Sequence, residues 1–384
     1  MSRVDALVRP TAASLKGKGR VCTLGMFIID HFEVQDEGGQ PVPIDEEAIG
    51  GGGVHAMTAA RLFLPPSHCA LLVDRGDDFP QHFADQLEAL GADMVWFRRR
   101  DGKTTRALNI YSGTAIGEGH QTFQYLSPQL NLSLRDLLVP PSPFATPHHP
   151  EWVHVVVRIP RAQFLVQEAR QIFEAGVDGI GKGWRPRMIW EPLDIKPDRA
   201  SQELDDWLNL APNFAAISPN LIELQTVLSL PRSEETQDDV VHAAEIFHRK
   251  LKEAHADAAP ALVLRAGALG SYTIATGWKG WVPAYWRRTE QDRVVDVTGG
   301  GNAFLGGLCA GLLASDGNYR TGWCGCRISL IAANIYAAAA ASFAIEQRGL
   351  PRLESTSNGE TWNGCEAWSR IQEMARRVDD MEAA

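Results

Sequence analysis

The residues best suited to chemistry lie in a glycine-rich segment, 296–307, which reads Asp-Val-Thr-Gly-Gly-Gly-Asn-Ala-Phe-Leu-Gly-Gly. It follows the β-prone residues 293–295 and leads into an Ala- and Leu-rich run, so we predict a strand, a glycine turn and a helix. Glycines let a backbone approach a ligand closely, and the free N–H groups at a helix start favour an anion. The structural alternative is a tight turn followed by a helix that packs through its glycines. The residues expected to form the anion hole are Gly299, Gly300 and Gly301.

This segment resembles the C-terminal signature of the ribokinase-like (PfkB) carbohydrate kinase family, which reads D-T-x-G-A-G-D before a helix. Asp296, Gly299 and Gly301 match it, whereas Gly300 replaces the alanine and Asn302 replaces the final aspartate. In that family the glycine turn holds the transferring phosphoryl group, and the final aspartate accepts the proton of the substrate hydroxyl. The Gly-Gly-Gly-Asn sequence is most similar to a fungal branch of the family. It is not a Walker loop, which would place Lys and then Ser or Thr after the last glycine.

Two earlier motifs resemble the family's substrate side. Gly25-x-x-x-x-Asp30 is similar to a first-strand motif whose aspartate holds sugar hydroxyls, and residues 50–55 are similar to a Gly-Gly motif that normally ends in asparagine. The alternative roles are a turn residue or cap for Asp30 and a packed imidazole for His55. Arg106 is suited to holding phosphate, with a surface arginine as its alternative. The resemblance implies substrate contacts for Asp30, Gly51, Gly52 and His55, with Arg106 beside them.

Two further motifs resemble the family's nucleotide side. Asn220-x-x-Glu223 is similar to the N-x-x-E motif that the family ties to magnesium and phosphate, although a helix N-cap with its capping-box partner explains the same pair. Gly267-x-x-Gly270 is similar to the family's T-x-G-x-x-G, with Arg265 in the threonine position. The implied cofactors are ATP and Mg²⁺. The resemblance implies nucleotide contacts for Arg265, Gly267, Gly270 and Thr298, and indirect magnesium contacts for Asn220 and Glu223.

Asn302 raises the main functional question. An amide cannot take up a hydroxyl proton as a carboxylate does, and loss of general-base catalysis costs about 10²- to 10⁴-fold in rate. Phosphoryl transfer depends mostly on positioning and charge neutralisation, which an intact anion hole still supplies. We consider three interpretations. The first is an ATP-dependent phosphotransferase acting on a hydroxyl of a small sugar-like or nucleoside-like metabolite. The second is a catalytically silent regulatory protein that binds a nucleotide or metabolite, and the third is a pocket used for a different reaction.

The elements that must position these residues alternate between short apolar runs and helical patterns. This alternation predicts an α/β protein with a mostly parallel sheet, and the resemblance implies a ribokinase-like three-layer α/β/α sandwich. Segments 34–46 and 104–124 are expected to form a small β-lid. The main expected strands are 21–29, 70–73, 152–157, 188–190 and 261–265.

We predict three parts along the chain. Residues 1–18 form a flexible N-terminal tail, 19–350 the α/β domain, and 351–384 a C-terminal extension with an amphipathic helix near 362–378. The Pro-rich segment 138–150 is expected to be an exposed connection.

Composition limits the partners. A net charge of −10 argues against a nucleic-acid surface, and no apolar run is long enough to cross a bilayer. With no secretory signal pattern at the start, we expect a cytoplasmic protein with no membrane contact. The six cysteines are scattered and are expected to be reduced, and Cys324-Gly-Cys326 lacks further ligands for a metal. The expected partners are ATP, a small-molecule substrate and a second copy of the chain bound through the lid.

Overall fold

The structure is a computed structural model. It describes residues 7, 9–11, 13–35, 39–112, 121–146, 148–232, 236–255, 259–275, 278–315, 327–357 and 359–383. The pair Cys324 and Cys326 and the tip of the second lid segment lie outside these residues. The described cysteines Cys22, Cys69, Cys309 and Cys365 are all free thiols.

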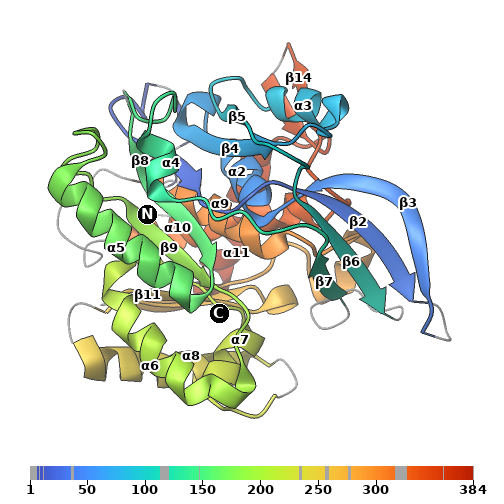
Figure 1. Cartoon of the computed structure of the whole chain (residues 1–384). Helices are drawn as coiled ribbons and strands as arrows, with labels where there is room; N and C mark the ends of the chain where they lie inside the picture. The colour runs from blue at the N-terminus through green and yellow to red at the C-terminus, as the bar shows by residue number, and fades with distance from the viewer. Residues whose placement is uncertain are drawn as a thin grey trace.

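A nine-stranded sheet forms the middle of the protein, in the order β13-β12-β11-β10-β9-β8-β1-β4-β5 (Figure 1). The strands from β11 to β5 are parallel, and β12 and β13 add an antiparallel edge. All residues of β1 and β11 are buried, as expected for a parallel sheet covered on both faces. The strands are β1 (Arg20–Thr23), β4 (Cys69–Arg75), β5 (Val95–Arg99), β8 (Pro150–Val157), β9 (Arg187–Pro192), β10 (Ala216–Ile217), β11 (Ala261–Arg265), β12 (Ser271–Ala275) and β13 (Trp278–Val282).

Helices cover both faces of this sheet and complete the predicted three-layer sandwich. Val21 and Cys22 of β1 contribute to different hydrophobic cores, because successive strand side chains point to opposite faces. One core contains α2 (Gly52–Arg61), α3 (Gln81–Glu88), α9 (Gly300–Ala314), α10 (Arg327–Ala344) and α11 (Ala367–Ala383). The other, whose larger helices lie together in Figure 1, contains α4 (Leu134–Leu138), α5 (Ile159–Ala175), α6 (Ala200–Leu210), α7 (Leu221–Val227) and α8 (Gln237–His255).

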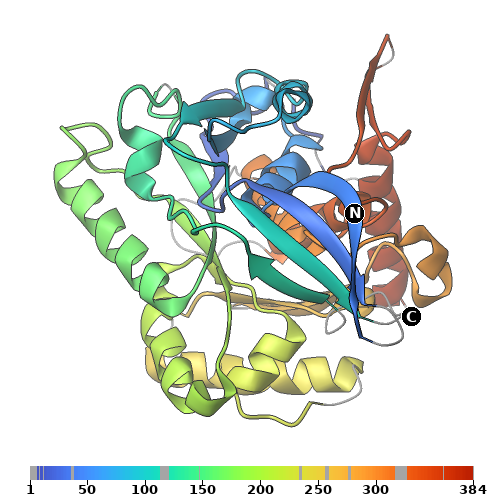
Figure 2. The ribbon, with the colours of Figure 1, turned by 45° about the vertical axis from the view of Figure 1, so that its right-hand side comes forward.

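A second, four-stranded sheet forms the predicted lid, in the order β3-β2-β6-β7. Figure 2 shows its strands side by side as a curved sheet next to the main body. The lid starts earlier in the chain than the segment 34–46, because β2 already begins at residue 28. Its strands are β2 (Ile28–Gln35), β3 (Pro41–Gly50), β6 (Arg106–Ser112) and β7 (Gln121–Tyr125).

The prediction of one strand over 21–29 is wrong. β1 ends at Thr23, and β2 begins at Ile28 in the other sheet. Between them Gly25 contacts the first turn of α2, where a Cβ on Gly25 would lie 2.5 Å from the Gly53 nitrogen. The chain therefore leaves the central sheet at a close backbone contact and enters the lid.

The strand predicted over 293–295 is also wrong. A 3₁₀ helix, Arg288–Arg293, ends there instead. The backbone N–H groups of Val295 and Asp296 both donate to the carbonyl oxygen of Ile345, which follows α10. This segment is therefore held by the end of a helix and not by a neighbouring strand.

Both ends of the described chain pack against the main body. Leu15 is fully buried and Lys18 Nζ donates to the Leu313 carbonyl oxygen at 3.0 Å, so residues at the end of the expected tail are packed. The C-terminal helix begins at Ala367 and not near 362, after a hairpin of β14 (Leu353–Thr356) and β15 (Gly359–Trp362). In segment 138–150, Phe144 is fully buried, so this connection is anchored in the core.

No helix among the described residues combines the length and the apolar character needed to cross a membrane.

Candidate functional site

Two helix N-termini meet beside the end of β1. α2 begins after the N-cap residue Gly51, and α9 begins after the N-cap residue Gly299. They are in contact, since a Cβ on Gly52 would lie 2.3 Å from Oδ1 of Asn302 in the first turn of α9. Each helix start carries a partial positive charge and N–H groups without helical partners. The convergence of the two starts therefore favours an anionic ligand.

The backbone at both helix starts requires glycine. Gly51 has φ 95° and Gly299 has φ 78°, in the left-handed region that side chains disfavour. A Cβ on Gly299 would also lie 2.4 Å from the His55 ring. Glycine packing is present further along α9 as well, where a Cβ on Gly306 would lie 1.8 Å from the Ala56 carbonyl oxygen. The tight turn and the glycine-packed helix of the structural alternative are therefore both present.

Two buried polar atoms at this convergence have no hydrogen-bond partner among the described residues. They are Oδ1 of Asn302 and Nδ1 of His55. Burial lowers the pKa of His55 to about 4, although the charge of Asp296 acts in the opposite direction, so the imidazole is neutral at pH 7. An unpaired buried acceptor is costly, and a ligand hydroxyl would satisfy Asn302.

Asp296 stabilises the glycine turn. Its Oδ1 accepts the N–H of Thr298 at 2.9 Å, and its Oδ2 accepts the hydroxyl of Tyr111 at 3.0 Å. Tyr111 lies on β6, so this carboxylate joins the turn to the lid. Asp296 is 4% exposed and both its oxygens are occupied, which makes it a support of the turn and not a second proton acceptor.

Asp30 lies on lid strand β2 and is also buried. A Cβ on Gly50 would lie 1.9 Å from its Oδ2, and its Oδ1 has no partner among the described residues. Burial raises the pKa of Asp30 to about 7; the nearby side chain of Asn109 opposes this rise, and the charge of Asp296 adds to it. A buried carboxylate with an open acceptor fits the predicted role of holding substrate hydroxyls.

A buried polar network crosses the ends of the parallel strands. The guanidinium of Arg265, at the end of β11, donates to Glu191 at 2.9 Å, and Nε2 of His154 lies 3.2 Å from the other oxygen of Glu191. Nδ1 of His154 lies 3.1 Å from Oγ1 of Thr23, which accepts the N–H of Gly25. Burial opposes the charge of Glu191, but Arg265 and His154 outweigh it and hold the pKa of that carboxyl below its usual value. The network therefore links Arg265, predicted to lie on the nucleotide side, to Gly25 of the motif predicted to lie on the substrate side.

The pair Asn220 and Glu223 forms a complete capping box at the start of α7. The Glu223 N–H donates to Asn220 Oδ1 at 2.8 Å, and the Asn220 N–H donates to Glu223 Oε2 at 2.8 Å. The same Glu223 oxygen lies 3.7 Å from Arg265 Nη2. Across the described part of the chain, no group of three or more His, Cys, Asp or Glu side chains is arranged to hold a metal ion. These residues do not form a magnesium site made by the protein alone.

The two other glycines predicted to contact the nucleotide, Gly267 and Gly270, lie at a 3₁₀ turn shortly after Arg265. Gly267 has φ 52° and Gly270 has φ 102°. A Cβ on Gly270 would lie 2.2 Å from the Val282 carbonyl oxygen, so this turn packs tightly against β13. The turn lies on the same strand end as Arg265, as the motif predicts.

Arg106 differs from its expected role. Its guanidinium donates to Glu47 at 2.9 Å and to Asp78 at 3.1 Å, and Nη1 lies 3.0 Å from His31 Nε2. These contacts connect the lid strands to the turn after β4. We therefore assign Arg106 to holding the base of the lid.

Sequence reasoning missed Tyr111, Glu191, His154 and Thr23. Glu191 carried a usable signal, because a charged residue directly follows the apolar run 188–190 at an expected strand end. His154 inside the strand 152–157 is a weaker signal of the same kind. Nothing in the sequence pattern connects Tyr111 to the glycine turn.

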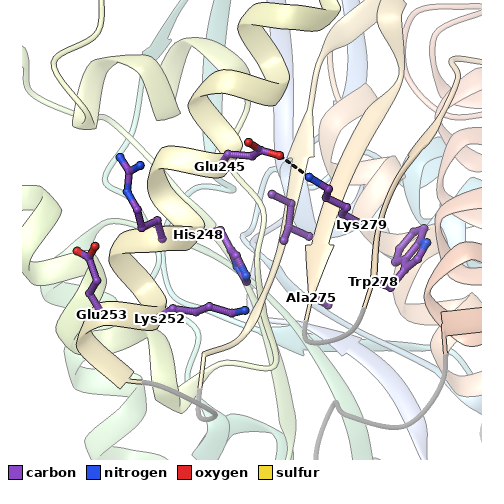
Figure 3. A pocket seen from close by; sticks show the side chains of 9 residues that line it. Glu245, His248, Lys252, Glu253, Ala275, Trp278 and Lys279 are labelled. Carbon is purple, nitrogen blue, oxygen red and sulfur yellow. Dashed lines mark hydrogen bonds and ion pairs between the residues drawn. The ribbon is translucent and has the colours of Figure 1, made fainter.

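A separate surface cavity of about 740 Å³ lies between α8 and the β12–β13 edge. Figure 3 shows Glu245 of α8 paired with Lys279 of β13, with His248, Lys252 and Trp278 nearby. The ion pair joins Glu245 Oε1 and Lys279 Nζ at 2.6 Å. The cavity's lining residues include Ala275, at the end of β12 remote from Arg265, since Ser271 pairs with Arg265 and Ala275 lies four residues further along the strand. This cavity is not part of the glycine-turn site.

The fold and this site define an α/β protein with a lid and a glycine turn at the start of a helix. The chain belongs to the pfkB family carbohydrate kinases, whose sequence profile it matches over residues 18–356. It is 27% identical over 374 residues to Protein MAK32 of Saccharomyces cerevisiae, with 94% of this chain and 93% of that protein covered. It is 30% identical over 381 residues to an uncharacterized protein of Schizosaccharomyces pombe, with 94% of each covered.

A solved ribokinase from Giardia lamblia has the same fold. It superposes with a TM-score of 0.62 at 17% identity, and the match covers 95% of this chain and 99% of that chain. The predicted ribokinase-like α/β fold is confirmed.

Proposed function

We propose that this chain is an ATP-dependent phosphotransferase that acts on a hydroxyl of a small sugar-like or nucleoside-like metabolite. The observation that carries the proposal is the buried, unpartnered Oδ1 of Asn302 at the convergence of two helix starts. An acceptor in that place is suited to a substrate hydroxyl, and the helix starts beside it are suited to a phosphoryl group. Membership in a family of carbohydrate kinases supports the same reaction class.

Each part of the site has a distinct task in this mechanism. Bound ATP supplies the transferable phosphoryl group. The N–H groups at the start of α9 stabilise negative charge on that group, and the glycines admit it without a Cβ clash. Asp30 accepts further substrate hydroxyls, and the neutral His55 beside Gly299 limits water at the turn. The lid excludes solvent from above the site.

Asn302 orients the reacting hydroxyl but does not take its proton. The proton therefore leaves to the phosphoryl oxygens or to water as transfer proceeds, which is slower than transfer to a carboxylate. The chain then binds substrate and ATP but transfers the phosphoryl group slowly.

The test is phosphoryl transfer by wild type, Asn302→Asp and Asn302→Ala over a panel of sugars and nucleosides, measured as phosphorylated product. We expect slow turnover for wild type, a gain of about 10²-fold or more for Asn302→Asp because a general base is restored, and a loss for Asn302→Ala. Gln202→Asp, an exposed change on α6, is the matched control and should leave turnover unchanged.

Absence of product from both wild type and Asn302→Asp with every acceptor would refute the phosphotransferase. ATP binding without product in that experiment would instead identify the regulatory protein considered above.

A further inference from the structure

A guanidinium group lies against the glycine turn. A Cβ on Gly301 would lie 2.1 Å from Nη1 of Arg265 and 3.7 Å from Oε1 of Glu191. Any side chain at 301 would therefore collide with the arginine. A fixed positive charge thus stands beside the start of α9, where the helix itself already favours an anion.

Three elements hold this guanidinium in place. Nη2 donates to Glu191 Oε1 on β9 at 2.9 Å and to the Ser218 carbonyl oxygen after β10 at 3.1 Å. It also lies 3.7 Å from Glu223 Oε2 on α7. The Arg265 side chain is 10% exposed, so these contacts and not solvent determine its position. Arginine stays protonated in proteins, so the charge is permanent.

The two carboxylates beside the turn, those of Glu191 and Glu223, already face this arginine. Mg²⁺ binds through carboxylate and phosphate oxygens in a strict octahedral arrangement. Here Glu191 faces Arg265 and His154, and Glu223 faces Arg265 and the Asn220 N–H. A divalent cation between these groups and the phosphates would be repelled by the guanidinium. Arginine, in contrast, presents planar paired donors that match phosphate oxygens.

We propose that Arg265 is a resident cation of the phosphate site and takes the place of Mg²⁺ in holding the ligand's phosphate groups against the glycine turn. The proposal rests on the proposed function, because it concerns the same nucleotide site. It states that the positive charge at the phosphate site comes from a side chain of this protein. Phosphate groups therefore bind to this chain when no divalent metal is present.

The test is calorimetric titration of the full chain with ADP and, separately, with inorganic tripolyphosphate, each in EDTA and in Mg²⁺. We expect wild type to bind both probes in EDTA, with each Kd changing less than about threefold on adding Mg²⁺, since Arg265 already supplies the charge. Arg265→Thr should weaken binding in EDTA by about tenfold or more, because charge-assisted hydrogen bonds to phosphate are lost. Mg²⁺ should recover part of that loss, and Arg265→Lys should be intermediate.

Two further variants separate an effect on phosphate binding from an effect on folding. Arg265→Thr leaves Glu191 without its cation, so the double variant Glu191→Gln with Arg265→Thr removes the unpaired charge and should give the same loss of binding. Arg199→Thr is the matched control, because Arg199 is exposed and its side chain bonds only to Gln202 among the described residues. Thermal unfolding of each variant confirms that it is folded before titration.

Two results would overturn the proposal: wild-type binding that disappears in EDTA but is present in Mg²⁺, or Arg265→Thr binding both probes as wild type does. Metal-free binding of tripolyphosphate that depends on Arg265, without binding of ADP, would support the resident cation and refute the nucleotide site. If neither probe binds wild type in either condition, both proposals are refuted.

Discussion

The hydroxyl of Tyr111, on lid strand β6, donates a 3.0 Å hydrogen bond to Oδ2 of Asp296 at the start of the glycine turn. The other oxygen of Asp296 accepts the Thr298 N–H at 2.9 Å. One buried carboxylate therefore fixes both the turn and the position of the lid above it. Any movement of β6 away from the body must break a hydrogen bond to this carboxylate.

Replacing Tyr111 with Phe should loosen the lid. The substitution leaves Asp296 buried with one donor fewer, and a hydrogen bond to a charged group contributes about 1.5 to 3 kcal/mol. We expect the free energy of unfolding to fall by about that amount and the amides of β6 to exchange faster with deuterium. Tyr125→Phe, a change at the other described lid tyrosine, whose hydroxyl bonds to no described residue, is the control. Unchanged exchange in β6 of Tyr111→Phe would show that the hydrogen bond does not hold the lid.

Replacing Glu191 with Gln should destabilise the whole fold. Glu191 pairs with Arg265 and His154 and is 5% exposed, and removing one partner of a buried ion pair costs about 3 to 5 kcal/mol. Chemical denaturation measures the change. Glu245→Gln breaks the exposed pair with Lys279 and should change the stability little, because exposed pairs are screened by water. If wild type and Glu191→Gln have the same free energy of unfolding, the ion pair between Glu191 and Arg265 does not stabilise the fold and the prediction is wrong.

The sequence predicted the elements whose signal is local. The glycine turn, the capping box at Asn220 and Glu223, and the layered α/β fold each follow from short patterns, and all three are present. The strand expected over 21–29 failed because its break depends on Gly25 meeting Gly53 of α2, a contact between distant segments.

Residue type alone was a poor guide to the role of Arg106. An arginine near a lid is suited to phosphate, but the guanidinium of Arg106 donates to Glu47 and Asp78, which lie on the lid and on the turn after β4 and not on the glycine turn. The nucleotide contact expected for Arg265 stays a prediction. Its motif position predicted the nucleotide side, but only the structure shows that Glu191 holds it against Gly301.

The lid is expected to bind a second copy of the chain. Val42 on β3 and Phe123 on β7 are 49% and 44% exposed, and both lie on the outer strands of the lid sheet. Exposed apolar side chains on open edge strands favour pairing with another chain. Light scattering after size exclusion should give a dimer for wild type and a monomer for Val42→Lys with Phe123→Lys. A wild-type monomer at every concentration tested would contradict the prediction.

Asp30 should make both stability and substrate binding depend on pH near neutrality. Its pKa is raised to about 7 in the folded protein, from an ordinary value of about 4 for an exposed aspartate, because burial disfavours the charge. Between these two values the folded state holds a proton that the unfolded state has released, so the stability contribution of Asp30 falls as pH rises from about 4 to about 7 and is constant above. At pH 8 the full penalty amounts to at most about 4 kcal/mol.

Asp30→Asn removes this penalty. The free energy of unfolding of Asp30→Asn minus that of wild type should be small at pH 4, grow as the pH is raised, and level off above pH 7. Substrate binding to wild type should strengthen as the pH rises through about 7, because ionised Asp30 accepts hydroxyl donors without first losing a proton. Glu33→Gln, on the same strand, is the control. If the difference in free energy of unfolding between Asp30→Asn and wild type does not vary from pH 4 to 8, the folded pKa of Asp30 is close to its ordinary value. Substrate binding would then not depend on the ionisation of Asp30 near neutral pH.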